Sequence, residues 1–402
     1  MLNKYLEKLL YFMSGISIGF VAWGHTLFLT IFAILIIFAY FFIEKRINFF
    51  ALVFGYYLAA SRGLFWGTIT YYDITTAGGV YLAAALLSSL AWILFWGKTQ
   101  KTKIASFLAA QAILILPPIG LISWVNPILT AGLITPKAGS MGGVFGEIVG
   151  FGLFFILIYL MVFGLNVIRK QFYTQKTTMY IMMNFVLLLG IAYNSSVHIL
   201  KNNSNSEILV INSNENYETG TVSPLVDFQR QIKYLEQIEN SKNDIFLLPE
   251  NALGYVTPAS DIIWQNTDTD KTILAGASFN NDDGSYNNTL VIIAHGEIKQ
   301  VYKQRIPVPV AMWKPWANND AKADIWSKGG IILNDKKYGV LICYEQLIML
   351  PWVQTMLYNP DLIIAISNVW WAKDTSILKI QEQNIQLWSL LFDKPFAFSY
   401  NL

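Results

Sequence analysis

The sequence has little charge and few residues that carry redox or acid-base chemistry. Only 13% of its 402 residues are charged and 54% are hydrophobic, which excludes an ordinary soluble protein and indicates a membrane. The single cysteine, Cys343, excludes a disulfide within the chain and leaves one thiol to be explained. A net charge of +2 without a basic stripe argues against direct binding of nucleic acid. Since the sequence shows neither a metal-ligand cluster nor a P-loop, no metal and no other cofactor is expected.

Acidic residues are concentrated beyond residue 200, whereas the first half consists of long apolar runs broken by short basic clusters. This asymmetry predicts a polytopic transmembrane domain over residues 1–199 and a water-exposed domain over residues 200–402. The first two apolar stretches are short and joined at Trp23-Gly24-His25, so one re-entrant or signal-anchor hairpin is the alternative to two spans. We count seven apolar stretches as spans, and several are near the ~20 residues that cross a bilayer. They are 9–23, 26–43, 48–70, 79–96, 104–125, 144–168 and 179–195.

The loops between these stretches alternate between basic and nearly uncharged. By the positive-inside rule, the basic loops lie in the cytoplasm and everything after about residue 196 lies outside it. With an odd number of spans, this predicts a multi-pass protein of the bacterial inner membrane whose second domain is periplasmic. The basic residues are Lys4, Lys8, Lys45, Arg46, Lys98, Lys101, Lys103, Arg169, Lys170 and Lys176.

Beyond Glu207 the hydrophobic period no longer fits membrane helices. An amphipathic pattern predicts a helix over residues 225–239, and turn-rich segments separate short apolar runs. The runs predict strands at 208–211, 245–248, 272–277, 290–294 and 338–342. We therefore expect an α/β core, with a sheet packed by helices.

Three segments place a reactive side chain where a predicted strand ends. Glu250 follows Leu247-Leu248-Pro249, Lys303 precedes Gln304-Arg305, and Cys343 follows Leu341-Ile342. Polar groups at the carboxyl ends of strands can converge on one crevice in an α/β sheet. Taken singly, Glu250 and Lys303 also fit solvated surface charges, and Cys343 fits a small buried apolar residue.

The combination favours chemistry. The histidines, His25, His198 and His295, lie outside any segment typical of a cysteine protease, so a Cys-His mechanism fits poorly. A carboxylate in a dry pocket can accept the thiol proton, and a nearby ammonium favours the thiolate and the oxyanion that forms on attack. A Glu, a Lys and a Cys therefore make a coherent set for acyl transfer.

These segments, in this order and spacing, resemble the nitrilase (carbon-nitrogen hydrolase) superfamily, whose membrane-attached branch is apolipoprotein N-acyltransferase. The resemblance implies an α-helical transmembrane bundle followed by an αββα sandwich. It implies Glu250 as general base, Lys303 as stabiliser of the tetrahedral intermediate, and Cys343 as the nucleophile that becomes a thioester. The substrate pocket that it implies consists of Tyr344, Glu345, Trp370 and Trp371.

Two departures separate the chain from the lipoprotein acyltransferases. Their additional Glu, eight residues beyond the catalytic Lys, is replaced by Ala311, and no returning transmembrane segment is expected before Leu402. The chain more closely resembles acyltransferase-like membrane proteins encoded with conjugal-transfer genes, which implies conjugation machinery as a partner. This resemblance is carried by Tyr57–Gly63, Pro117–Gly120, Trp124, Asn126-Pro127, Ala131-Gly132, Lys303–Arg305, Pro307–Pro309 and Trp313.

The expected function is a two-step acyl transfer, in which Cys343 takes an acyl group from a membrane phospholipid and passes it to an amine. The sequence does not identify that amine. One alternative is lipoprotein maturation itself, and another is a catalytically silent component of a conjugation apparatus. Retention of all three triad residue types argues against the silent component. A third alternative, an amidase that uses water in place of the amine, leaves seven spans unexplained.

Overall fold

The computed structural model describes residues 2–171, 197–200, 207–215, 224–265, 270–314, 316–317 and 320–402. These residues form two compact units. The helical unit comprises Met1–Asn203 with Lys379–Lys394, and the sandwich unit comprises Ser204–Leu378 with Pro395–Leu402. The helical unit thus includes a segment from within the range that was predicted to form the second domain.

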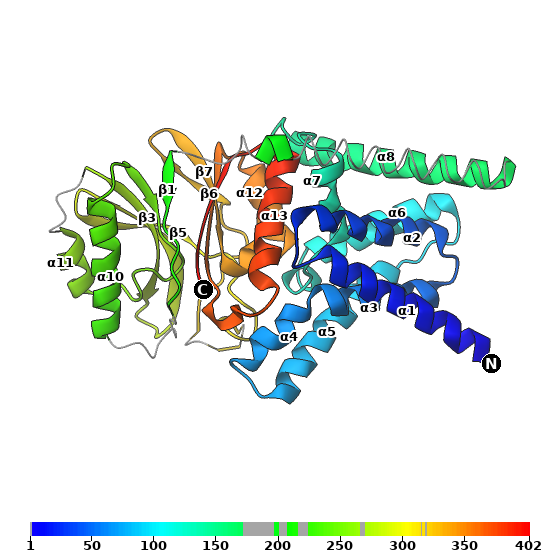
Figure 1. The fold of residues 1–402 in the computed structure, drawn as a ribbon, viewed down its shortest axis with the longest axis horizontal. Helices are drawn as coiled ribbons and strands as arrows, with labels where there is room; N and C mark the ends of the chain where they lie inside the picture. The colour runs from blue at the N-terminus through cyan, green and yellow to red at the C-terminus, as the bar shows by residue number, and fades with distance from the viewer. Residues whose placement is uncertain are drawn as a thin grey trace. The chain divides into compact units, whose positions relative to one another are not determined.

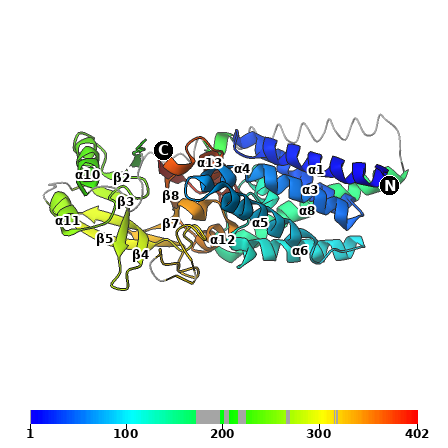
Figure 2. The same ribbon diagram turned by 90° about the horizontal axis from the view of Figure 1, so that it is seen from below.

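The helical unit is built from helices that approach one another closely. A Cβ added at Gly15 of α1 would lie 1.9 Å from the carbonyl oxygen of Leu52, and one at Gly55 of α3 would lie 2.2 Å from that of Phe12. Figure 2 shows α1 and α3 side by side. Small residues permit such contact between apolar helices. The elements are α1 (Leu2–Ala22), η1 (Leu27–Ala33), α2 (Ile34–Phe42), α3 (Arg46–Ala60), α4 (Arg62–Ile69), α5 (Ile74–Ile93), α6 (Gln100–Ile115), η2 (Ile119–Leu121), η3 (Pro127–Thr130), α7 (Ala131–Ile134), α8 (Gly143–Gln171) and α13 (Ile377–Phe392).

Two of the described helices, α5 and α8 over Gly143–Leu165, are long and apolar enough to cross a bilayer. α3 and α4 pass the same test only together, and the pair is bent by 46°, as in a broken span or a re-entrant loop. Only 22% of the apolar window of α8 is buried, so most of its surface is free to contact lipid. These helices support membrane association. Seven spans and a periplasmic second domain stay predictions, and the predicted span 179–195 lies outside the described residues.

The sandwich unit contains two sheets. In the first, of order β1-β2-β3-β4-β5, the strands β1 to β3 run parallel and β3 to β5 antiparallel. In the second, of order β6-β7-β8-β9, β6 is antiparallel to β7 and the others are parallel. The strands are β1 (Ile208–Val210), β2 (Ile245–Leu247), β3 (Thr272–Asn280), β4 (Tyr286–Ala294), β5 (Glu297–Lys303), β6 (Gly330–Leu333), β7 (Lys336–Ile342), β8 (Leu362–Asn368) and β9 (Phe396–Asn401). Every predicted strand is confirmed.

The side chains of β2 alternate between two cores, which defines the layers. Leu247 packs in a cluster that also contains Val340 of β7 and Ile364 of β8, so the two sheets face each other. Phe246 packs on the opposite face with Tyr234 of α10 (Pro224–Glu239), and α11 (Pro258–Gln265) joins the same cluster. Figure 1 shows α10 and α11 beside the first sheet. With α12 (Met349–Leu357) against β7, the helix–sheet–sheet–helix fold predicted for this part is confirmed.

Candidate active site

Cys343 lies at a sharp turn from β7 into the short helix η4 (Cys343–Gln346). Its φ is +49°, in the left-handed region that residues with a Cβ avoid at a cost of ~1–2 kcal/mol. Its side chain is 4% exposed, and Sγ lies 4.0 Å from the carbonyl oxygen of Asn368 at the end of β8. A strained turn between a strand and a helix is a common way to present a nucleophile in α/β enzymes.

Glu250 lies three residues beyond the end of β2 and is held by groups from both sheets. Its Oε1 accepts a hydrogen bond from Asn288 Nδ2 at 2.6 Å, and its Oε2 accepts one from the backbone N–H of Asn368 at 2.7 Å. Gly276 of β3 allows the close approach, because a Cβ there would lie 2.4 Å from the Cα of Glu250. The carboxyl group is buried, at 4% exposure.

The carboxyl group of Glu250 and the thiol of Cys343 interact. Burial raises the pKa of Glu250 to about 7, although hydrogen bonds from Asn288, Cys343 and the Asn368 backbone oppose the shift. Burial also raises the pKa of the Cys343 thiol, and the negative charge of Glu250 raises it further. Hydrogen bonds from the backbones of Asn368 and Tyr344 act in the opposite direction. The resting pair is therefore a protonated thiol beside a carboxyl group poised near neutrality, which suits Glu250 as the acceptor of the thiol proton.

The buried side-chain amides of Asn288 and Gln304 connect the carboxyl group of Glu250 to the backbone of the turn at Cys343. Neither residue was predicted as a site residue. Asn288 Nδ2 also donates to Gln304 Oε1 at 2.9 Å, and Gln304 Nε2 donates to the carbonyl oxygen of Ile342 at 2.9 Å. That carbonyl belongs to the residue directly before Cys343. The position of Gln304 next to Lys303 was a signal for it, whereas the sequence around Asn288 carries none that we can identify.

Lys303 is the last residue of β5, and its side chain is exposed. Pairing between β4 and β5 shifts by one residue, which leaves Val301 as the extra residue of a bulge. After this bulge the side chains of Tyr302 and Gln304 are buried and Lys303 is not. Within the described part of the chain, Lys303 makes no hydrogen bond or ion pair with Glu250 or Cys343. Its catalytic role stays a prediction.

Glu345 is fully buried and its carboxylate is already occupied. It accepts hydrogen bonds from the Tyr302 hydroxyl at 3.1 Å, from the Arg305 backbone N–H at 2.6 Å and from the Ile342 N–H at 2.8 Å. Arg305 Nε lies 3.3 Å from the same carboxylate, and both side chains of this ion pair are 0% exposed. Glu345 therefore anchors β5 to the turn at Cys343, and its place in a substrate pocket stays a prediction.

Replacing Glu345 by Gln is expected to lower the free energy of unfolding by about 3 kcal/mol, because the Arg305 guanidinium would remain buried without its counter-charge. Denaturant unfolding of the purified protein, followed by tryptophan fluorescence, measures this loss. The matched control is Glu239→Gln, because Glu239 is an exposed residue at the end of α10. Equal stability of the two variants would contradict the anchoring role.

The other residues predicted for the substrate pocket lie near Cys343. The backbone of Tyr344 contacts the Cys343 sulphur, and its side chain is buried in η4. Trp370 and Trp371 are half-buried just after β8, and Trp371 Nε1 donates to the carbonyl oxygen of Asn368 at 3.0 Å. Among the residues that the structure describes, no group of three His, Cys, Asp or Glu side chains is placed to hold a metal. The groups that surround the Cys343 thiol are the carboxyl group of Glu250 and the backbones of Tyr344 and Asn368.

Part of the sandwich unit matches a known protein family. Residues 282–389, which include Lys303 and Cys343, match the family model for carbon-nitrogen hydrolases. This match agrees with the resemblance to carbon-nitrogen hydrolases that the sequence predicted.

Most of the chain is also similar to two curated proteins. It is 29% identical over 359 residues to the probable conjugal transfer protein TraB of Sinorhizobium fredii, with 86% of each chain covered. It is 28% identical over 367 residues to the conjugal transfer protein TraB of Agrobacterium fabrum, with 86% of this chain and 82% of that protein covered. The predicted resemblance to conjugal-transfer proteins is confirmed.

Solved structures of the superfamily resemble about half of the chain. A mutant amidase from Nesterenkonia covers 48% of this chain and 75% of its own, at a TM-score of 0.35 and 10% identity. A carbon-nitrogen hydrolase from Helicobacter pylori also covers 48% of this chain and 73% of its own, at a TM-score of 0.34 and 14% identity.

Proposed function

We propose that the chain is a membrane-bound acyltransferase that uses Cys343 to move an acyl group from a phospholipid to an amine, in the context of conjugal transfer. The observation that carries this proposal is the buried contact between Glu250 and Cys343 at converging strand ends, with the pKa of the base raised to about 7. The similarity to proteins named for conjugal transfer supports the context. The apolar helices α5 and α8 support access to a lipid donor.

In the first half-reaction, Glu250 takes the thiol proton while Cys343 Sγ attacks the ester carbonyl carbon of the donor. The tetrahedral intermediate collapses by breaking the bond to the glycerol oxygen, which takes the proton from Glu250 and leaves as the lysophospholipid alcohol. An acyl thioester remains on Cys343. Because Glu250 ends this step as a carboxylate, it can act as a base a second time.

In the second half-reaction, the amine nitrogen attacks the thioester carbonyl carbon and gives a proton to Glu250. The carbon–sulphur bond breaks, the proton returns to Sγ, and the product is an amide. The Tyr344 backbone beside the sulphur supplies one group near the developing oxyanion. In this proposal Lys303 supplies a second donor, which requires its exposed side chain to turn towards the substrate when that substrate binds.

Intact-mass analysis of the purified chain incubated with phospholipid tests the proposal. A mass increase equal to one acyl group, removed by hydroxylamine and absent in Cys343→Ala, is the expected result. A labelled donor then shows where the acyl group goes, since transfer places it on an added amine and hydrolysis releases it as a free acid. No adduct on folded protein would refute the thioester intermediate.

A catalytically silent component of a conjugation apparatus is the second candidate. It is favoured by the exposed position of Lys303, away from the described contacts of Glu250 and Cys343. The two candidates differ in whether the thiol is needed, which the Cys343→Ala variant decides.

We also propose that the sandwich unit lies in the periplasm. Because Cys343 is the single cysteine, this orientation can be tested with one introduced cysteine at a time. In a Cys343→Ala background, Asp282→Cys is expected to react in intact cells with a maleimide that cannot cross the inner membrane. Lys101→Cys is expected to react only after the membrane is permeabilised. Both positions are exposed, so accessibility depends on the side of the membrane. The reverse labelling pattern would place the sandwich unit in the cytoplasm.

A further inference from the structure

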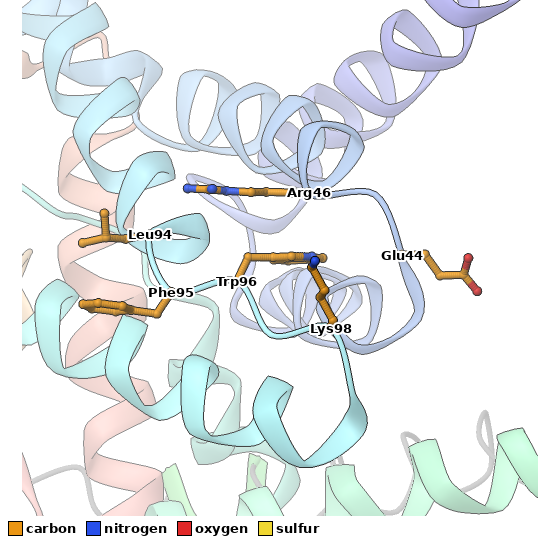
Figure 3. Close-up of a pocket in the computed structure, with 6 residues that line it drawn as sticks. All are labelled: Glu44, Arg46, Leu94, Phe95, Trp96 and Lys98. Carbon is orange, nitrogen blue, oxygen red and sulfur yellow. The ribbon is translucent and has the colours of Figure 1, made fainter.

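A pocket of about 520 Å³ lies within the helical unit, at the connections that join α2 to α3 and α5 to α6. Figure 3 shows the six residues that line it, which are Glu44, Arg46, Leu94, Phe95, Trp96 and Lys98. Its volume falls within the ~300–1,000 Å³ of ordinary small-molecule sites. The acyl-transfer mechanism uses none of these residues.

Two cations of this pocket are uncompensated. Arg46 and Lys98 are exposed, and in the described part of the chain neither makes an ion pair or a side-chain hydrogen bond. The neighbouring Lys45, by contrast, pairs with Glu7 at 3.0 Å. The carboxylate of Glu44 points away from the other five residues in Figure 3. Arg46 also begins α3, so the positive end of that helix adds to the field. The pocket therefore favours an anion.

One wall of the pocket is rigid and aromatic. The ring of Trp96 stacks on Phe49 at 5.4 Å and meets Tyr40 edge-on at 5.1 Å. Behind it, Lys103 Nζ lies 5.0 Å from the centre of the Trp96 ring. That ammonium is fixed by the carbonyl oxygens of Tyr40, Phe41 and Ile43, at 3.1, 3.0 and 2.7 Å. The charge of Glu44 acts on this buried ammonium and offsets part of it, so Arg46 and Lys98 supply most of the positive potential of the pocket.

The rim of the pocket is apolar. Leu94 and Phe95 are 56% and 57% exposed, at the end of α5, which is one of the two helices apolar enough to cross a bilayer. A free anion would gain nothing from an apolar rim. An amphiphile would bind the cations of the pocket through its charged head and the rim through its hydrocarbon chains. Aromatic and basic side chains together are typical of the membrane-water interface.

We propose that this pocket binds the phosphate-bearing headgroup of an anionic phospholipid, with its acyl chains along Leu94 and Phe95. Arg46 and Lys98 contact the phosphate, and Trp96 packs against the glycerol region. The bound lipid is a structural ligand and not the acyl donor. The proposal rests on membrane insertion of the helical unit and does not rest on acyl transfer.

Native mass spectrometry of the full chain with phosphatidylglycerol or phosphatidylcholine tests the proposal. We expect one phosphatidylglycerol to be held roughly tenfold more tightly than phosphatidylcholine, and a double variant, Arg46→Gln with Lys98→Gln, to lose this preference. The control is Lys8→Gln with Lys101→Gln, which removes the same charge from exposed positions outside the pocket and should stay within about twofold of the wild type. All three proteins are compared by size-exclusion chromatography to show that they are folded.

Several outcomes would overturn the proposal: retained preference in the pocket variant, an equal loss in the control, equal binding of the two lipids, or binding of inorganic phosphate alone at the same site. An equal loss in the control would show non-specific attraction to surface charge. Carbonate extraction of membranes reports separately on insertion, and the thioester assay reports separately on acyl transfer, so failure of either is distinguishable from failure of this site.

Discussion

Replacing Cys343 by alanine is expected to lower the rate of acyl transfer by at least roughly a thousandfold, because no other thiol exists in the chain to form the thioester. The rate is measured as labelled acyl groups that reach an added amine. Cys343→Ser keeps the size and the hydrogen bond of the side chain, yet a hydroxyl beside a base of pKa about 7 is a far weaker nucleophile. We therefore expect the serine variant to be nearly as inactive.

The same variants decide between an enzyme and a silent component in cells. If the thiol is required, plasmid transfer in a strain that carries only Cys343→Ala falls to the frequency of a strain that lacks the protein. Full transfer by that variant, at normal protein abundance, would support the silent component. Folding is not at risk, because alanine fits the space of this buried side chain and tolerates its turn about as well as cysteine.

The proximity of Glu250 and Cys343 was predictable because it depends on local features, whereas their roles as base and nucleophile stay predictions. A strand ends before Glu250 and another ends before Cys343, and the end of a strand in an α/β fold is where reactive groups gather. The structure brings these two together through Asn368, whose backbone lies beside both. Residue type and strand position predicted that the two side chains converge, and the resemblance to the nitrilase superfamily supplied their expected roles.

Lys303 and Gln304 show where such reasoning ends. The bulge at Val301 shifts the alternation of β5 by one residue, which buries Gln304 and leaves Lys303 exposed. Nothing in the residue types of this segment reveals the shift. Glu250 is therefore connected to the turn at Cys343 through the side-chain amide of Gln304. A search for charged residues does not find this amide.

Long-range packing was also beyond the sequence. The segment Lys379–Lys394 lies between β8 and β9 in the chain, within the range predicted for the second domain, yet it groups with the helical unit. Within that unit, Gly132 lies so close to this segment that a Cβ would meet the carbonyl oxygen of Leu387 at 2.2 Å. A contact between residues so far apart in the chain leaves no periodic signal.

Glu250→Gln is the second substitution for which we expect a large effect. Loss of the base is expected to slow formation of the thioester by roughly a hundredfold to ten-thousandfold. In the wild type, Glu250 accepts the thiol proton only when it is ionised, and burial raises its pKa to about 7. The acylation rate should therefore rise about tenfold per pH unit below pH 7 and level off above it. Rapid-quench measurement of the adduct between pH 5 and pH 9 gives this profile.

The matched control is Glu239→Gln, which removes an exposed carboxylate and should leave the profile unchanged. A rate in Glu250→Gln that still rises through pH 7 would assign that titration to another group. A rate that matches the wild type would remove Glu250 from the mechanism.

The raised pKa of Glu250 also predicts how the stability of the fold depends on pH. A carboxyl group whose pKa is higher in the folded state than in the unfolded state stabilises the fold when it is protonated, and this contribution is lost as the pH rises through the folded value. For Glu250 the window runs from 4.5 to about 7, and the loss is about 3 kcal/mol. Denaturant unfolding at pH 5 and pH 8 should show this fall in the wild type and a smaller one in Glu250→Gln. An equal fall in the free energy of unfolding of both proteins would mean that Glu250 is already ionised at pH 5. Its pKa would then be ordinary, and it would not explain an acylation rate that levels off near pH 7.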